Sequence, residues 1–199
     1  MKSEKMKIYF LRHGETDWNK NGMMQGHSDI PLNENGIAQA NSIAEFMHGK
    51  QFNIVYVSPL KRALDTAKIV VKAKANLIVL DHRLKERGYG EFEGSPYEQY
   101  RELIKENEDF IPKGGESRVE FRKRIKEFFE NLDEKHEDIL IVAHGGVFNA
   151  VLKILFNLET EEARKYRLGN CEHCIIEKTD KFVMLIKDQK IVLQKEISN

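Results

Sequence analysis

The sequence predicts an α/β protein whose central sheet is mostly parallel and ends in an antiparallel edge. Short apolar segments alternate with amphipathic helical segments through residue 156, which is typical of parallel βαβ units. Further apolar segments follow at 174–178, 182–187 and 191–195, and the polar turns between them predict an antiparallel meander. A length of 199 residues is compatible with a single domain over 1–199.

The charge balance excludes some classes of partner. Basic and acidic residues number 32 each, so no overall field recruits nucleic acid or an anionic membrane, and we expect neither as a partner. No apolar stretch approaches the roughly 20 residues that span a bilayer, and no secretory signal is evident, so we expect a cytoplasmic protein. Cys171 and Cys174 form one C-x-x-C motif without a second ligand pair, which predicts neither a zinc site nor a disulfide framework.

The first predicted strand, residues 8–11, ends at Arg12, His13 and Gly14. The carboxyl ends of parallel strands border the ligand crevice of an open α/β sheet. An arginine fork suits a phosphate or carboxylate, and a neutral imidazole is a nucleophile that forms covalent intermediates, so the pair indicates phosphoryl transfer. For this pair alone a structural role, such as capping a carbonyl, is the alternative.

Residues 17–32 form a long turn-rich segment without a clean period. Its Trp18, Asn19 and Gln25 predict an ordered, functional loop, because a disordered linker would avoid tryptophan. A helix should then begin after the cap residue Asn33. Its apolar residues recur at helical spacing on one face: Ile37, Ala40, Ile43, Ala44 and Met47.

The second predicted strand, residues 54–57, ends at Ser58 and Pro59, which we interpret as a helix cap and a first helical position. Arg62 lies in the first turn of that helix, where it could direct a second guanidinium into the same crevice. The alternative is a solvated arginine. Residues 77–80 predict the third strand.

Residues 84–94 contain three glycines but do not fit G-x-G-x-x-G, because Glu93 stands in place of the third glycine, and we exclude a dinucleotide site. Glu86 is a candidate general acid, since a carboxyl beside a phosphate dianion retains its proton at neutral pH. A surface carboxylate is the alternative. A short helix at 96–107 and a break at 111–115 precede a helix that opens with a Ser117–Glu120 capping box.

The fourth predicted strand, residues 139–142, ends at Ala143-His144-Gly145-Gly146, before a helix at 147–156. A second histidine thus follows a strand, as His13 does. His-Gly-Gly is also similar to the oxyanion segment of lipases, but the chain contains no G-x-S-x-G, which argues against a serine hydrolase.

The motifs occur in a characteristic order. They are Leu11-Arg12-His13-Gly14-Glu15-Thr16 with Trp18-Asn19, Gln25-Gly26, Asp29-Ile30-Pro31-Leu32, Ser58-Pro59-Leu60 with Arg62-Ala63 and Thr66-Ala67, Glu86-Arg87 with Gly90 and Gly94, Gly115-Glu116-Ser117, and Ala143-His144-Gly145-Gly146. This ordered set, from about residue 8 to residue 147, resembles the histidine phosphatase superfamily, the phosphoglycerate-mutase-like proteins.

The resemblance implies a three-layer αβα sandwich with helices on both faces of the sheet. It also implies a phosphohistidine mechanism that uses no metal or other cofactor. His13 is then the nucleophile, Glu86 the acid, and Arg12, Arg62 and His144 surround the phosphate. Further positions line the substrate pocket: Thr16, Asn19, Gln25, Gly26 and Gly145. Residues 88–116 are expected to form a lid-like insertion on the leaving-group side.

The chain resembles the short phosphatase-type branch of this family. We therefore expect a phosphomonoesterase acting on small phosphorylated metabolites. The alternatives are a cofactor-dependent phosphoglycerate mutase, or a specific ribazole-phosphate or sugar-bisphosphate phosphatase. A binding domain that has lost catalysis is disfavoured, because all the expected catalytic side chains are present. The oligomeric state is left open, with a homodimer among the options.

Overall fold

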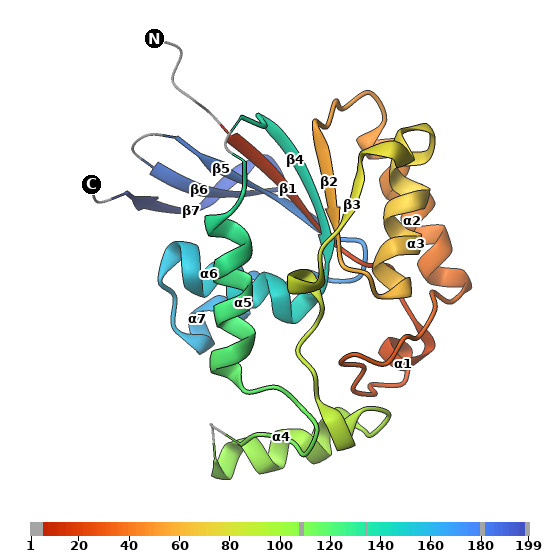
Figure 1. The fold of residues 1–199 in the computed structure, drawn as a ribbon, viewed down its shortest axis with the longest axis vertical. Helices are drawn as coiled ribbons and strands as arrows, with labels where there is room; N and C mark the ends of the chain where they lie inside the picture. The colour runs from red at the N-terminus through yellow and green to blue at the C-terminus, as the bar shows by residue number, and fades with distance from the viewer. Residues whose placement is uncertain (1–5, 108–109, 134, 180–181, 198–199) are drawn as a thin grey trace.

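The computed structural model describes residues 6–107, 110–133, 135–179 and 182–197. Within them, one seven-stranded sheet runs through the molecule (Figure 1). Its strands are β1 (Met6–Arg12), β2 (Ile54–Val57), β3 (Ile78–Leu80), β4 (Asp138–Ala143), β5 (His173–Lys178), β6 (Phe182–Lys187) and β7 (Lys190–Glu196). The α-helices are α1 (Asp17–Lys20), α2 (Glu34–Met47), α3 (Lys61–Val71), α4 (Tyr97–Glu106), α5 (Arg118–Glu130), α6 (Gly145–Phe156) and α7 (Thr160–Ala163).

The strand order is β3-β2-β4-β1-β5-β6-β7. Strands β3, β2, β4 and β1 pair in parallel, whereas β5, β6 and β7 continue the sheet from β1 as antiparallel neighbours. The predicted fold class, including its antiparallel C-terminal edge, is therefore confirmed.

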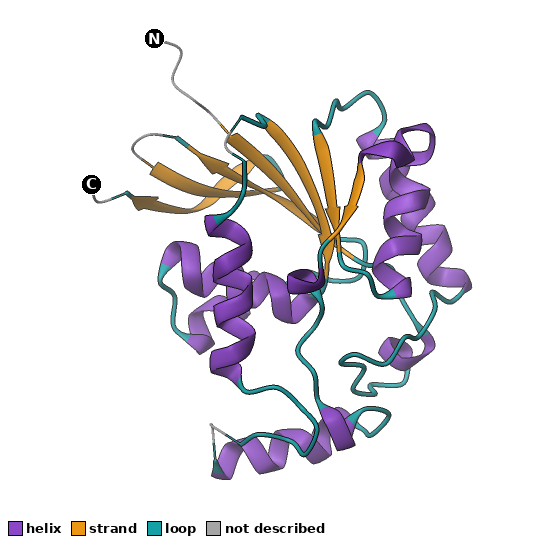
Figure 2. Cartoon of the chain, in the orientation of Figure 1, coloured by secondary structure: helices purple, strands orange, loops and turns teal. Residues whose placement is uncertain are grey.

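Helices cover both faces of the sheet, which confirms the three-layer arrangement (Figure 2). Successive side chains of a strand point to opposite faces. Phe10 accordingly packs in the core with Ile125 of α5 and Phe148 of α6, while Leu11 packs in the core with Ala63 of α3. All of these side chains are almost completely buried, so the two cores fix the sheet between its helices.

Strand register brings the two histidines together. Arg12 of β1 is paired with Ala143 of β4, so His13 and His144 leave the sheet side by side. Val57 of β2 is paired with Val142 of β4, which places Ser58 beside the same point. Three sequence motifs separated by dozens of residues therefore meet at the carboxyl ends of β1, β4 and β2.

Two local predictions need correction. Helix α3 begins at Lys61 with Leu60 as its cap residue, so the prediction of Ser58 as cap and Pro59 as first helical residue is wrong. The Ser58 hydroxyl instead lies 2.8 Å from Nε2 of His144. The predicted loop at 17–32 also contains the short helix α1, which Thr16 caps. The caps predicted at Asn33 and Ser117 are confirmed.

Short 3-10 helices occur at Lys72–Leu77, His82–Leu84, Gly90–Phe92 and Arg164–Tyr166. The second of them leads from β3 into the segment that carries Glu86. Among the described residues, no helix is both long and apolar enough to cross a membrane.

Candidate active site

A cavity of about 750 Å³ contains most of the predicted site residues. Those in its lining are Arg12, His13, Asn19, Gln25, Gly26, Arg62, Glu86 and Gly145. His144 lies directly behind this lining, with its ring centre 5.1 Å from that of His13. Thr16 is fully buried and caps α1 instead of lining the cavity.

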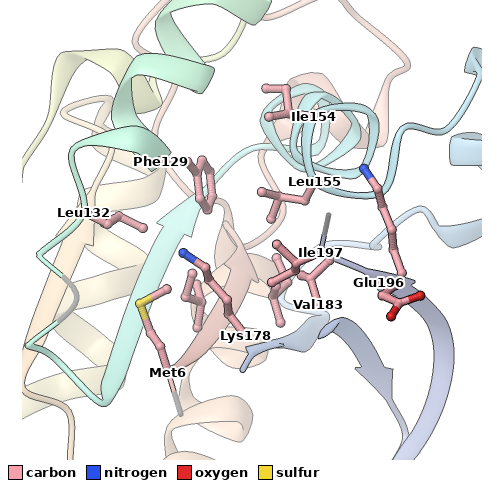
Figure 3. A pocket seen from close by; sticks show the side chains of 12 residues that line it. Met6, Phe129, Leu132, Ile154, Leu155, Lys178, Val183, Glu196 and Ile197 are labelled. Carbon is pink, nitrogen blue, oxygen red and sulfur yellow. The ribbon is translucent and has the colours of Figure 1, made fainter. Parts of the chain in front are cut away.

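A second cavity, of about 380 Å³, has a different character (Figure 3). It lies among α5, α6 and the antiparallel strands, where Phe129, Leu155 and Val183 line it. None of the predicted site residues lines this cavity. The predicted site residues therefore gather at the larger cavity alone.

The hydrogen bond of His13 fixes which ring nitrogen can react. Nδ1 lies 2.7 Å from the carbonyl oxygen of Gly14. A carbonyl only accepts, so Nδ1 carries the proton in the neutral ring and the lone pair is on Nε2. Burial, followed by the charges of Arg62 and Arg12, lowers the pKa of His13 well below its ordinary value. The ring is therefore neutral at neutral pH, with its free lone pair on Nε2.

Backbone carbonyls hold the two arginines in place. Arg12 donates through Nη1 to the carbonyl of Leu168 at 2.8 Å. Arg62 donates through Nη1 and Nη2 to the carbonyls of Ser28 and Gly26, both at 2.8 Å. Burial lowers the pKa of Arg62 to about 10, which still leaves it charged at neutral pH. Both cations are thus fixed before a substrate arrives.

His144 is completely buried and bonded to Ser58 at Nε2. Burial, the charge of Arg62 and the neighbouring His13 lower the pKa of His144 well below its ordinary value. If the Ser58 hydroxyl donates to Nε2, the proton of the neutral ring is on Nδ1. His144 can then donate a hydrogen bond without carrying a charge.

Four buried side-chain atoms in the described residues have no hydrogen-bond partner: Arg12 Nε, Arg62 Nε, His144 Nδ1 and Gln25 Oε1. Buried polar atoms in folded proteins are nearly always paired, so their gathering in the residues around His13 points to a ligand. The two guanidinium nitrogens are donors, as phosphate oxygens require.

Glu86 is held by backbone donors at the entrance of α6. Its Oε2 accepts from the N–H of Gly146 at 2.9 Å, and its Oε1 accepts from the N–H of Arg87 at 2.8 Å. A Cβ atom on Gly146 would lie 2.1 Å from Oε1, so only glycine permits this approach. The second glycine of the His-Gly-Gly motif therefore makes room for the candidate acid.

Glu93 organises the loop that carries Gln25 and Gly26, a role that the sequence did not reveal. Its carboxylate accepts from the N–H groups of His27 and Ser28 at 2.9 and 2.8 Å, and from the Ser28 hydroxyl at 2.7 Å. Gly26 has φ +52°, and a Cβ there would lie 2.1 Å from Glu93. The sequence feature that could have indicated this role is the carboxylate of Glu93 within the glycine-rich segment 84–94. We interpreted that residue only as evidence against a dinucleotide site.

Arg124 is a second feature that the sequence analysis missed. From α5 it donates to the carbonyls of Arg83, Lys85 and Glu86 at 2.6, 2.7 and 2.9 Å. Two further bonds join it to the carboxylate of Glu116, at 2.7 and 2.9 Å. No periodicity marks this role, because the acceptors are backbone atoms about 40 residues earlier in the chain.

The two cysteines are free thiols, with Cys174 buried and Cys171 partly so. Burial raises the pKa of Cys171 to about 12 and raises that of Cys174 as well. The backbone N–H of Cys171 lies 3.1 Å from the carbonyl of Arg12 and 3.2 Å from that of His13. The backbone of Cys171 thus supports the end of β1.

Comparison with known proteins agrees with this geometry. The profile described as "Histidine phosphatase superfamily (branch 1)" matches residues 8–187. The Adenosylcobalamin/alpha-ribazole phosphatase of Escherichia coli (strain K12) is 29% identical over 193 residues, covering 90% of this chain and 94% of the relative. Phosphoglycerate mutase-like protein 4 of Arabidopsis thaliana is 36% identical over 171 residues, covering 79% and 73%.

A solved structure extends the likeness to three dimensions. Phosphoserine phosphatase of Entamoeba histolytica, in complex with 3-phosphoglyceric acid, superposes with a TM-score of 0.75 at 29% identity, covering 92% of this chain and 98% of that one. An αβα sandwich with two histidines at the carboxyl ends of neighbouring parallel strands thus defines a class of phosphoryl-transfer enzymes. This chain belongs to the histidine phosphatase superfamily. It is a phosphatase that acts on small phosphorylated substrates.

Proposed function

We propose that His13 is the nucleophile of a phosphomonoesterase and that Glu86 is its general acid and base. The observation that carries this proposal is the set of unpaired nitrogen atoms around His13: Arg12 Nε, Arg62 Nε and His144 Nδ1. Together they supply donors for a phosphoryl group beside a neutral imidazole. Donors fixed in advance at the point where charge develops stabilise a transition state without reorganisation.

In the first step, Nε2 of His13 attacks phosphorus. The bond from phosphorus to nitrogen forms while the bond from phosphorus to the ester oxygen breaks. The departing oxygen takes the proton of Glu86, which leaves an alcohol and an ionised carboxylate. The Gly146 N–H, 2.9 Å from that carboxylate, holds it in place throughout the step.

In the second step, a water molecule attacks the phosphohistidine. Glu86 takes a proton from the water as the phosphorus–nitrogen bond breaks, and inorganic phosphate is released. His13 returns to its neutral form with the proton still on Nδ1, where the Gly14 carbonyl holds it. Each group thus ends the cycle in its starting state.

Hydrolysis and mutase action differ only in the second step. A mutase must keep water from the intermediate until the phosphoryl group returns to another oxygen. The cavity has a volume of about 750 Å³, and we propose that water enters it beside the bound product, so that the intermediate is hydrolysed. Tyr100 and Ile104 of α4 line the cavity, and we propose that the segment 88–116 acts as a lid on the leaving-group side. We further propose that the chain works as one domain in the cytoplasm.

A screen of phosphate release from small phosphomonoesters, run beside a coupled assay of phosphoglycerate interconversion, tests the proposed function. We expect hydrolysis of several esters and an interconversion slower by orders of magnitude. Glu86→Gln should lower kcat for alkyl phosphates by roughly 10²- to 10⁴-fold. The matched control is Glu45→Gln, which alters an exposed carboxylate of α2 outside the cavity lining and should keep kcat within about twofold of wild type. Efficient interconversion with negligible phosphate release would place the chain among the mutases.

A further inference from the structure

Glu93 lies outside the lining of the larger cavity, yet both oxygens of its carboxylate are bound. Oε1 accepts from the backbone N–H groups of His27 and Tyr89 at 2.9 and 3.0 Å. Oε2 accepts from the backbone N–H of Ser28 at 2.8 Å and from the Ser28 hydroxyl at 2.7 Å. Burial alone would raise the pKa of Glu93, but these four hydrogen bonds hold the pKa below its ordinary value. The carboxylate is therefore ionised at neutral pH.

The peptide unit between Gly26 and His27 joins Glu93 to Arg62. Its N–H, on His27, donates to the Glu93 carboxylate at 2.9 Å. Its carbonyl, on Gly26, accepts from Nη2 of Arg62 at 2.8 Å. Because a peptide unit is planar, the direction of the N–H fixes the direction of the carbonyl. The Glu93 carboxylate thus determines where one anchor of the Arg62 guanidinium points.

The second anchor of Arg62 depends on Glu93 as well. Nη1 of Arg62 donates to the Ser28 carbonyl at 2.8 Å, and Glu93 binds both the N–H and the hydroxyl of Ser28. The two carbonyls fix the plane of the guanidinium, which is almost completely buried. They leave Nε of Arg62 without a hydrogen-bond partner in the described part of the chain. A phosphoryl oxygen suits this donor only if the guanidinium plane is correctly set.

Backbone hydrogen bonds attach the earlier part of this loop to the segment after Glu93. The N–H of Gly94 donates to the Met24 carbonyl at 2.8 Å, and the N–H of Met24 donates to the Ser95 carbonyl at 2.9 Å. These bonds do not involve the Glu93 side chain. A change of the Glu93 carboxylate should therefore disturb residues 26–28 without detaching the loop.

We propose that Glu93 is a positioning residue for phosphate binding, and that it acts on Arg62 through the Gly26–His27 peptide and Ser28. The proposal rests on the proposed function, because it takes the phosphoryl group at His13 as the group that Arg62 binds. Glu93 then serves the transferred phosphoryl group and not the leaving group. Its loss should weaken the binding of phosphate esters whatever their leaving group.

Glu93→Gln tests the proposal at nearly constant side-chain size. Whichever way the amide is turned, its NH₂ group faces at least one backbone N–H that the carboxylate had accepted. With inorganic phosphate as the probe, the constant for competitive inhibition should rise about tenfold. Values of kcat/KM should fall roughly 10²-fold, equally for aryl and alkyl phosphates. An unchanged inhibition constant in a folded variant would overturn the proposal.

The choice of esters separates this route from another one. Nε2 of His27 lies 2.8 Å from the carbonyl oxygen of Glu86, so the loop also contacts the segment of the proposed acid. A loss confined to alkyl esters would mean that Glu93 acts through Glu86, which would overturn the proposal. The matched control is Glu120→Gln, because the exposed Glu120 carboxylate also accepts from a backbone N–H, that of Ser117 at 3.0 Å. Both kinetic values should stay within about twofold of wild type.

A double-mutant cycle decides whether Glu93 acts through Arg62. In the Arg62→Gln background, Glu93→Gln should lower kcat/KM for an aryl ester by less than about twofold. The same loss in both backgrounds would indicate a general structural role and overturn the proposal. Ser28→Ala removes one of the four hydrogen bonds and should raise the phosphate inhibition constant about threefold, which tests the route if Glu93→Gln does not fold. Failure of the proposed function would look different, because the wild-type chain itself would then release no phosphate from any ester.

Discussion

Arg124 binds the backbone carbonyl of Glu86 at 2.9 Å, although the two residues lie 38 positions apart in the chain. The same guanidinium binds the carbonyls of Arg83 and Lys85 and pairs with the carboxylate of Glu116. Helix α5 thereby fixes the segment that carries the proposed acid. Arg124 touches no reacting atom in this account, so it is a positioning residue.

Arg124→Met should release this segment and misplace Glu86. A shift of about 1 Å in a reacting group can cost roughly 10²-fold, so kcat for alkyl phosphates should fall by about that factor. Aryl phosphates should lose much less, because a phenolate departs without full protonation. Steady-state kinetics over a series of leaving groups measures the difference. Lys126→Met, which breaks an exposed ion pair with Glu130 on the same helix, is the control. Equal losses on aryl and alkyl esters would indicate a general structural defect instead.

Gly146→Ala should affect the same step by another route. The added Cβ would lie 2.1 Å from Oε1 of Glu86, so the carboxylate must move away from the Gly146 N–H. We expect kcat for alkyl phosphates to fall by roughly 10²-fold, with little change in the melting temperature, because the change is confined to a side chain in the cavity. Phosphate release and thermal unfolding measure the two effects. Wild-type turnover of an alkyl ester by this variant would contradict the assigned position of Glu86.

Local sequence patterns predicted the strands, the helices α2 to α6 and the ends of β1 and β4, but neither of the four-residue helices α1 and α7. A short apolar segment marked each strand of the sheet. The Arg-His-Gly after β1 and the His-Gly-Gly after β4 indicated that two histidines lie at strand ends. These features depend on a few neighbouring residues, which is why they could be predicted. The start of α3 could not, because the Ser58 hydroxyl bonds a histidine 86 positions later.

Long-range polar contacts were not predictable in the same way. Glu93 and Arg124 act on backbone atoms of distant segments, and backbone acceptors leave no signature in a sequence. The cavity lining combines residues of separate helices, which only the fold brings together. Thr16 was predicted to line the substrate pocket, but its side chain caps α1 instead. That helix has only four residues, which is too short to show a helical period in the sequence.

The buried histidines predict how stability depends on pH. Burial lowers the pKa of His13 and His144 in the folded state below the ordinary value of 6.5, so the unfolded chain takes up these protons first as the pH falls. The contribution of these two histidines to the free energy of unfolding is therefore fully present above pH 6.5. It is lost below that pH by up to about 1.4 kcal/mol per pH unit for each histidine. Urea unfolding of wild type and His13→Gln in phosphate-free buffers at pH 7.5 and 5.5 measures this slope. The variant should show the smaller loss, and an unchanged slope would contradict a neutral, buried His13.

Chelation tests whether the two arginines neutralise the charge of the phosphate without a metal ion. In our account Arg12 and Arg62 supply the positive charge at His13. Prolonged treatment with EDTA should therefore leave the rate of phosphate release unchanged within error. Loss of activity that a divalent cation restores would show that a metal ion takes part in the reaction.

The most direct test of the central claim is to trap the intermediate on His13. Rapid acid-free quenching during turnover of a substrate with a radiolabelled phosphoryl group should yield a protein adduct that is stable in base and labile in acid, as phosphohistidine is. Peptide mapping should place the label on residue 13, and His13→Ala should abolish both the label and phosphate release. Wild-type rates of phosphate release by His13→Ala, or a label that maps to another residue, would contradict the mechanism proposed here.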